Sequence, residues 1–273
     1  MKRLVINADD FGLSAAVTAG ILEAHAAGTV TSTSMLVGCR GWADAAAKGR
    51  ATPTLGIGLH LNFLIGRPVT AARTLTDHRT GEFLSLARLV RRAVSGRLSG
   101  AEVAAECAAQ LATIRDAGLR VTHVDSHRHT HALPGIRSAV ASVAASEGLP
   151  LRRPLESHRW FRGDLTSQFH RALVGWSWRL SSTRAPATRA PDHFIGVSLQ
   201  GGTRFANRLA VVLDGLPEGT TELMVHPGRV DDDLVAADRY TWQRELELAV
   251  LLSASVRNRM ARGDIRLATF AQL

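Results

Sequence analysis

The sequence predicts an α/β fold, a (β/α) barrel of the TIM type that is irregular or incompletely closed. Three observations lead to this prediction. Short apolar runs alternate with Ala-rich helical stretches along the chain, which implies right-handed βαβ units and a parallel sheet. About six to eight such units fit into the 273 residues. Acidic residues and histidines directly follow the apolar runs, at the edge where parallel barrels carry their chemistry.

The first half of the barrel is predicted from three strands and two helices. Residues 3–10, RLVINADD, form an apolar run that ends in two aspartates. A helix follows, with Ser14 as its N-cap and Gly28 as its stop. The elements expected next are a strand at 30–38, a helix at 42–50, a strand at 54–62 and a loop insertion at 64–85.

The second half continues the alternation with longer helices. The elements expected there are a helix at 101–118, a strand at 120–127, a helix at 135–148, a short extended stretch at 149–154, strands at 193–199 and 221–228, a long helix at 242–263 and a strand at 265–270. Together they are predicted to form one catalytic domain over residues 1–273.

An insertion rich in Arg, Trp, Ser and Pro interrupts this pattern at about residues 152–191. Its tryptophans, Trp160, Trp176 and Trp178, could stack on a bound ligand. A lid over the site and a contact between subunits of a homo-oligomer are the alternative roles. The sequence leaves this choice open.

Composition excludes several classes of protein. The net charge of +9 comes almost wholly from scattered arginines, because Lys2 and Lys48 are the only lysines, and no nucleic-acid-binding module is recognisable. No apolar run is long enough to cross a membrane, and the N-terminal apolar stretch is too short for a signal peptide, so a cytoplasmic protein is expected. Cys39 and Cys107 lack metal-ligand spacing and are expected to be plain buried thiols.

Adjacent carboxylates at Asp9 and Asp10 carry the first chemical signal. Two like charges a few ångströms apart raise one pKa unless a cation neutralises one of them. A metal ion on one aspartate and a proton-accepting role for the other would resolve this. The structural alternative is a helix N-cap at Asp10 or Ser14 beside a solvated Asp9.

Histidines supply the second signal. His60 and His226 each end a predicted strand, where a single histidine could equally be a satisfied core residue. In VDSHRHTH, residues 124–131, a strand reaching His127 would place His123, Asp125 and His127 on one face. Neutral imidazole together with one carboxylate suits a first-row divalent ion that keeps open positions for water and substrate, whereas magnesium ordinarily prefers more oxygen ligands. The four strand-end clusters together predict a metal-dependent hydrolytic site.

Four motifs now indicate a family. NADDFG at 7–12, GLHLN at 58–62, DSHRHTH at 125–131 and HPG at 226–228 resemble, in this order, the YdjC-like family of carbohydrate deacetylases. That family includes chitooligosaccharide deacetylases and is distantly similar to the NodB-type polysaccharide deacetylases. The resemblance covers almost the whole chain. It implies a (β/α) barrel with one divalent metal ion, zinc or magnesium, held by Asp-His-His.

Carried onto the matching positions, the resemblance implies a role for each residue. Asp9 would be the general base and His226 the general acid. The metal ligands would be Asp10, His60 and His127.

Four more residues receive supporting roles from the same resemblance. Asp125 would orient an imidazole, while His129 and His131 would line the mouth or bind substrate, with packing of the loop as the alternative role for both histidines. Arg153 would match the arginine that orients the base carboxylate in NodB-type enzymes.

The function expected from these residues is removal of an N-acetyl group from an amino sugar, a chitooligosaccharide or a related N-acetylglucosamine compound, with release of acetate. One alternative is deacetylation of a lipid-linked acetylglucosamine of the hopanoid type. A second is a phosphoesterase or amidohydrolase with several metal ions, and a third is a metal- or sugar-binding protein without activity. The expected partner is thus a small carbohydrate, free or lipid-linked.

Overall fold

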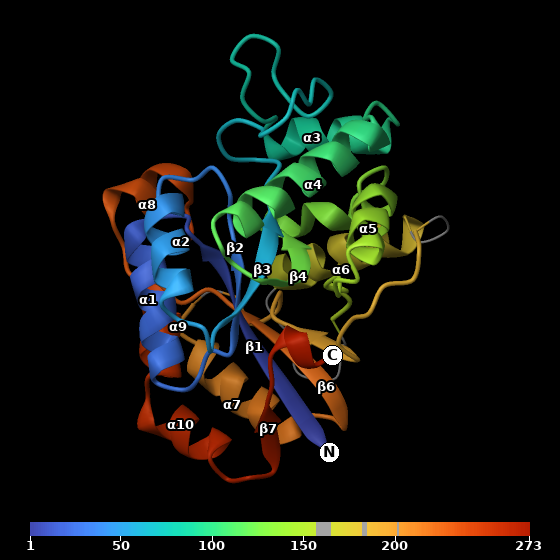
Figure 1. Ribbon diagram of the computed structural model, residues 1–273. Coiled ribbons are helices and arrows are strands. Elements are labelled where there is room, and N and C mark those ends of the chain that lie inside the picture. Colours follow the sequence, from blue (N-terminus) through green and yellow to red (C-terminus); the bar gives the residue numbers. More distant parts are fainter. Residues whose placement is uncertain (157–164, 182–184, 201) are drawn as a thin grey trace.

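A curled, all-parallel sheet forms an incompletely closed TIM-like barrel in the computed structural model, as the alternating pattern predicts (Figure 1). The structure describes residues 1–156, 165–181, 185–200 and 202–273. The strands follow one another in the order β4-β3-β2-β1-β6-β5, and β7 pairs with β1. Their bounds are β1 Lys2–Phe11, β2 Ser32–Met35, β3 Gly56–Leu61, β4 Val121–Ser126, β5 His193–Ile195, β6 Gly219–Val225 and β7 Ile265–Leu267.

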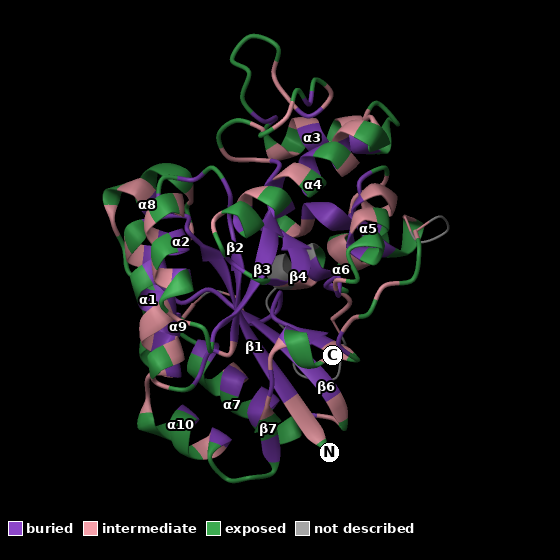
Figure 2. Ribbon diagram, in the orientation of Figure 1, coloured by how far each residue is buried: buried purple, intermediate pink, exposed green. Residues whose placement is uncertain are grey.

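Helices cover the outside of the sheet, with their buried faces turned toward the strands (Figure 2). Their bounds are α1 Ala15–Ala26, α2 Trp42–Arg50, α3 Leu86–Val94, α4 Gly100–Asp116, α5 Arg137–Ser146, α6 Leu165–Leu180, α7 Phe205–Gly215, α8 Asp232–Ala237, α9 Trp242–Leu251 and α10 Ala254–Met260. Ser14 caps α1 by accepting a hydrogen bond from the Val17 amide, and Gly28 follows that helix with a positive φ of 78°, as expected.

The prediction of a single long helix at 242–263 is wrong. Ser253 has an extended backbone and caps α10 through its side chain, so the segment consists of two helices, α9 and α10. Helices α3, α6, α7 and α8 were not predicted from the sequence. Cys39 and Cys107 are both free and buried, as expected. No helix among the described residues is long and apolar enough to cross a membrane.

The open edge of the barrel lies between β4 and β5, and residues 151–156 occupy it. Leu151 forms one parallel bridge with Val124 of β4, and Glu156 forms another with Phe194 of β5. These two isolated bridges are weaker backbone pairing than the continuous ladders elsewhere in the sheet. The closing segment therefore depends on its side chains to stay in place.

Part of the Arg- and Trp-rich stretch packs into the protein body. Trp178 on α6 is buried, and the guanidinium of Arg137 lies 3.5 Å from its ring centroid. Trp176 is exposed, whereas Trp160 lies outside the described residues. Trp178 is thus unavailable to stack on a sugar.

His123 fills the interior of the barrel below the strand ends. Its ring is fully buried and stacks on Phe270 at 3.7 Å between centroids. Burial lowers its pKa to about 3, so the imidazole is neutral. The ring also lies over Gly58 of β3, where an added Cβ would approach it to 2.3 Å. His123 is therefore a core residue, and Gly58 provides its space.

Gly58→Ala should destabilise the protein because the new methyl group would collide with the His123 ring. We expect a loss of about 1–3 kcal/mol in the free energy of unfolding, measured by urea denaturation in the presence of a chelator. Gly100→Ala, in the first turn of α4 with no atom within 4 Å of the new Cβ, is the matched control and should be neutral or slightly stabilising. Equal stability of Gly58→Ala and the unmutated protein would contradict the packing described here.

Candidate active site

A bulge in β1 points both adjacent aspartates to the same region. Ala8 pairs with Thr33 of β2, but Phe11 pairs with Met35, so β1 contains one extra residue. Asp10 has a positive φ of 74°, which non-glycine residues seldom adopt. In a regular strand the two side chains would point to opposite faces. The bulge instead brings both into one cavity, where each is only 2% exposed.

Asp9 is held as an ionised carboxylate by four hydrogen bonds. Arg152 Nη1 donates to Oδ2 and Nη2 donates to Oδ1, each at 2.7 Å, which is a bidentate pair. Asn7 Nδ2 and Ser34 Oγ donate to Oδ1 at 2.8 and 3.2 Å. Burial alone would raise the pKa of Asp9, but the charge of Arg152, the charge of His60 and the Arg152 hydrogen bonds together outweigh it and hold that pKa well below its usual range.

The prediction that Arg153 orients the carboxylate of Asp9 is wrong by one residue, because Arg152 makes this contact. Arg153 is exposed and donates to the backbone carbonyls of Pro191 and Asp192. Arg152 instead enters the barrel from the closing segment and is 0% exposed. Its guanidinium also lies 2.7 Å from Asp125 and 2.6 Å from Glu222.

Asp10, His60 and His127 form a compact cluster. His60 Nε2 and His127 Nδ1 lie 3.2 and 3.0 Å from the same oxygen, Asp10 Oδ1. One ligand atom from each residue lies within 4.8 Å of the others, and all three residues are buried. Two imidazole nitrogens and one carboxylate oxygen are a donor set that zinc and similar divalent ions prefer. The residues present therefore fit the metal that the sequence predicts.

Asp125 orients His60 from the neighbouring strand. The two residues are directly paired in the register of β3 and β4, and His60 Nδ1 donates to Asp125 Oδ1 at 2.7 Å. This bond leaves Nε2 facing Asp10, as the expected orienting role requires. Burial lowers the pKa of His60, but the charges of Asp125 and Asp9 dominate and raise it to about 10.

A second buried arginine, which the sequence analysis missed, holds Asp10. Arg244 Nη2 on α9 donates to Asp10 Oδ2 at 2.6 Å and to Asp238 Oδ2 at 3.0 Å. Arg128 Nη2 donates to the other oxygen of Asp238 at 2.8 Å. The charge of Arg244 and that of His127 hold the pKa of Asp10 well below its usual range despite burial. The sequence signal for a buried Arg244 was weak, because it was only a charged residue within a predicted helix.

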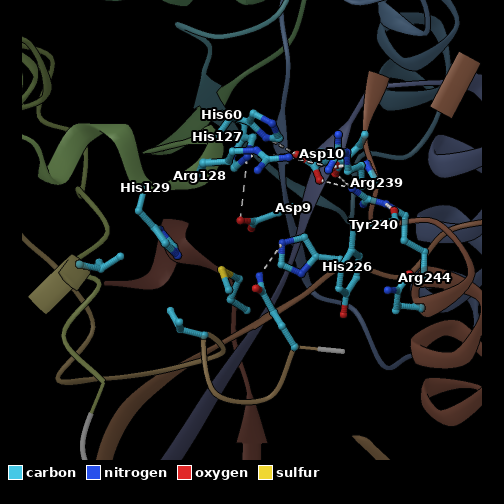
Figure 3. Close-up of a pocket in the computed structure, with 16 residues that line it drawn as sticks. Asp9, Asp10, His60, His127, Arg128, His129, His226, Arg239, Tyr240 and Arg244 are labelled. Carbon is cyan, nitrogen blue, oxygen red and sulfur yellow. Dashed lines mark hydrogen bonds and ion pairs between the residues drawn. The ribbon is translucent and has the colours of Figure 1, made fainter. Parts of the chain in front are cut away.

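His226 follows β6 and borders the cavity from another side. In Figure 3 its ring lies across the cavity from His60 and His127, with Asp9 between them. Gln200 Nε2 donates to its Nε2 at 3.3 Å, and Nδ1 has no hydrogen-bond partner among the described residues. The backbone amide of His226 donates to Glu247 of α9. Helix α9 thus supports both His226 and Asp10.

The remaining histidines of the DSHRHTH motif separate into two positions. Arg128 and His129 both have left-handed backbones, with φ of 54° and 53°, and His129 lines the cavity. His131 is fully buried, accepts from Ser126 Oγ through Nδ1 and donates through Nε2 to the Arg152 carbonyl. The expectation that His131 lines the mouth is therefore wrong, because its ring supports the closing segment instead.

The cavity over these residues has a volume of about 360 Å³. Most of its lining residues are polar or charged, and Val174, Val197 and Met224 are apolar. The residues that line it are Asp9, Asp10, His60, His127, Arg128, His129, Val174, Val197, Gln200, Met224, His226, Asp238, Arg239, Tyr240, Gln243 and Arg244.

Comparison with known proteins shows which family this chain resembles along its length. A family model described as YdjC-like protein matches residues 3–262. A carbohydrate deacetylase of Brevibacillus brevis is 32% identical over 277 residues, covering 99% of both chains. A chitooligosaccharide deacetylase of Enterobacter sp. (strain 638) is 34% identical over 278 residues, covering 100% of this chain and 99% of the relative.

A solved structure is similar over nearly the full length as well. It is a crystal structure from Enterococcus faecalis V583, described as a cellobiose-phosphate cleavage protein, and it has a TM-score of 0.81 at 27% identity. The match covers 99% of this chain and 98% of that one.

Arg152→Met should destabilise the protein strongly, because it leaves Asp9, Asp125 and Glu222 buried without their shared cation. We expect a loss of about 3–5 kcal/mol in the free energy of unfolding at pH 7, measured by urea denaturation. Arg153→Met is the matched control and should cost less than about 1 kcal/mol, since it removes two exposed or half-buried bonds to carbonyls. Similar losses for both variants would contradict the assignment of Arg152.

Zinc binding should release about one proton per chain at pH 7.5. With a pKa of about 10, His60 is protonated on both nitrogens before metal binding and must lose the Nε2 proton to become a ligand. The affinity should therefore rise with pH until His60 deprotonates unaided. Calorimetric titration in two buffers of different ionisation enthalpy measures the released protons, and a pH-independent affinity between pH 6 and 8 would count against it.

Proposed function

The chain belongs to the YdjC-like family, and on that premise we propose that it is a metal-dependent carbohydrate deacetylase. The reaction we propose is hydrolysis of the N-acetyl group of an amino sugar, a chitooligosaccharide or a related N-acetylglucosamine compound, to give the free amine and acetate. The observation that supports it best is the pairing of two unlike sites in one cavity. One is the Asp10–His60–His127 cluster, and the other is the arginine-bound carboxylate of Asp9.

Asp10, His60 and His127 would hold the metal ion. Once bound, a divalent ion would polarise the acetyl carbonyl and make a water molecule more acidic. Asp125 keeps His60 in the orientation that this requires, and Arg244 keeps Asp10 in place by binding its second oxygen.

Asp9 is the proposed general base, and Oδ2 is the oxygen that would accept the proton. Oδ1 already receives bonds from Arg152, Asn7 and Ser34, whereas Oδ2 receives one, from Arg152. Oδ2 also faces His60 Nε2 at 4.0 Å, so it is directed toward the metal cluster. The Arg152 pair keeps this carboxylate ionised and correctly turned before the water's proton is transferred.

His226 is the proposed general acid. A protonated ring nitrogen at this place could deliver a proton to the departing sugar nitrogen, opposite the attacking water. Gln200 and the Glu247-bound backbone hold the ring at the cavity, and Nδ1 is free of hydrogen bonds within the described part of the chain. His226 would thus protonate the leaving nitrogen, and Asp9 would deprotonate the water.

A site for several metal ions is less consistent with the contacts. The other cluster with suitable ligand atoms is Asp9, His60 and Asp125, but it shares His60 with the first. Both of its carboxylates also contact the Arg152 guanidinium, so a second cation would lie beside a fixed positive charge. Of the three additional histidines that could have served, His123 and His131 are turned into the core, and His129 lines the cavity but belongs to neither cluster of ligand atoms among the described residues. One ion per chain is therefore part of the proposal.

Acetate release from N,N′-diacetylchitobiose should depend on a divalent metal ion. The test uses full-length protein stripped with a chelator and reloaded with zinc, cobalt, magnesium or no ion. We expect activity with zinc or cobalt, lower activity with magnesium and none without an ion, because imidazole ligands favour the first two. Metal analysis should find one ion per chain. Two or more ions, with phosphoester hydrolysis instead of acetate release, would contradict the proposal.

Asp9→Asn separates catalysis from metal binding. It should reduce kcat by at least about 100-fold while zinc stays bound one to one, because Asp9 is not among the proposed ligands. Full activity in this variant would show that Asp9 is not the base. If zinc-loaded protein releases no acetate from the disaccharide, longer chitooligosaccharides and an acetylglucosamine attached to a lipid test whether only the substrate is different.

A further inference from the structure

Three buried carboxylates surround the single positive charge of Arg152. Its two terminal nitrogens bind Asp9, and Nη2 also lies 2.7 Å from Asp125. Its Nε donates to Glu222 Oε1 at 2.6 Å. All four groups are buried, with Arg152, Asp125 and Glu222 at 0% exposure. Asp9 and Asp125 adjoin the proposed metal ligands, whereas the contact between Arg152 and Glu222 lies outside that cluster.

Glu222 enters the barrel from β6, which lies between β1 and the edge strand β5. It pairs with Val5 in the register of β1 and β6, and Val5 is four residues before Asp9 on β1, so Glu222 lies deeper in the barrel than Asp9. Its Oε2 has no hydrogen-bond partner among the described residues. Burial and the nearby charges of Asp125 and Asp9 raise its pKa to about 7, although Arg152 opposes this. A buried acid with one hydrogen-bonded oxygen is costly, and its one hydrogen bond is to Arg152.

The guanidinium group is planar, so the bond at Nε decides where the other two nitrogens point. With Nε held by Glu222, Nη1 and Nη2 face the two oxygens of Asp9 together. Without that bond the plane could turn toward Asp125, which already shares Nη2. Asp9 Oδ2 would then lose its single hydrogen bond and its direction toward the metal cluster.

We propose that Glu222 is a positioning residue for the deacetylation: by binding Arg152 Nε from β6, it keeps the guanidinium bidentate on Asp9. Glu222 touches neither substrate nor the proposed metal ligands and acts through Arg152. This inference rests on the proposed function, since it concerns the orientation of the base proposed there.

Two substitutions of equal length test the proposal. Glu222→Gln keeps an oxygen that accepts from Arg152 Nε, whereas Glu222→Met fills the space without an acceptor. We expect the Met variant to lower kcat by about 10- to 100-fold with KM changed less than about threefold, and the Gln variant to regain most of kcat. Zinc content should stay at one ion per chain in both. Glu218→Gln, an exposed acid just before the same strand, is the control for loss of an acid and should behave like the unmutated protein.

A second readout does not depend on activity. The Nε–H resonance of Arg152, assigned by its absence in Arg152→Lys, should be visible and slow to exchange with solvent in the unmutated protein and in Glu222→Gln. In Glu222→Met it should shift and exchange faster. Fast exchange in the unmutated protein overturns the proposal even if the Met variant does not fold. A Met variant with unchanged kcat, or a Gln variant as impaired as the Met variant, also overturns it.

The two readouts distinguish the failure of this inference from failure of the proposed function. If no acetylated sugar is hydrolysed but the resonance behaves as expected, Glu222 positions Arg152 and the reaction assigned to the site is wrong. If hydrolysis is found but neither the Arg152 resonance nor kcat changes when the hydrogen-bond acceptor at position 222 is removed, the proposed reaction is supported and the proposed role of Glu222 is wrong.

Discussion

Burial of two neighbouring carboxylates at the end of β1 is the constraint on which the rest of the site depends. Removing an ion from water costs several kcal/mol even after relaxation, and a second like charge beside it raises the cost. The protein meets this with a separate buried arginine for each aspartate, Arg152 for Asp9 and Arg244 for Asp10. These arginines come from opposite parts of the structure, the closing segment and α9. The aspartates therefore determine where two distant segments must pack.

The same constraint makes two identical side chains chemically different. Asp9 lies among hydrogen-bond donors that fix both oxygens, and its remaining lone pairs point into the cavity. Asp10 has one oxygen on Arg244 and the other within hydrogen-bond distance of two imidazoles. Environment rather than residue type thus distinguishes the proposed proton acceptor, Asp9, from the proposed metal ligand, Asp10, as it does for pairs of carboxylates in other hydrolases. The bulge at Asp10 makes this division feasible, because it lets consecutive residues share one cavity.

Sequence reasoning predicted the barrel and the clustering of Asp9, Asp10, His60 and His127, because both follow from local patterns repeated at strand ends. It did not place Arg152, since two adjacent arginines in an extended stretch point to opposite sides and only tertiary contacts decide which is inside. It also missed Arg244 and Glu222, whose burial depends on partners more than 60 residues away in the chain. His131 was misplaced because the strand ends at Ser126 and a left-handed turn then redirects the motif.

Closure of the barrel and orientation of the proposed base depend on the same ion pairs. Among the described residues, the backbone of 151–156 pairs with the rest of the chain through two isolated bridges and one hydrogen bond from the Leu151 amide to the Arg189 carbonyl. The contacts of Arg152 with Asp9, Asp125 and Glu222 further connect the closing segment to β1, β4 and β6. A whole buried ion-pair network can ordinarily be replaced by apolar packing, often with a gain in stability, whereas removal of one partner alone is costly. Here such a replacement would release the edge of the barrel from the polar groups around the cavity and leave Asp9 without its fixed direction. The costly buried network is therefore explained by its position: one guanidinium both completes the fold and prepares the carboxylate beside the metal cluster.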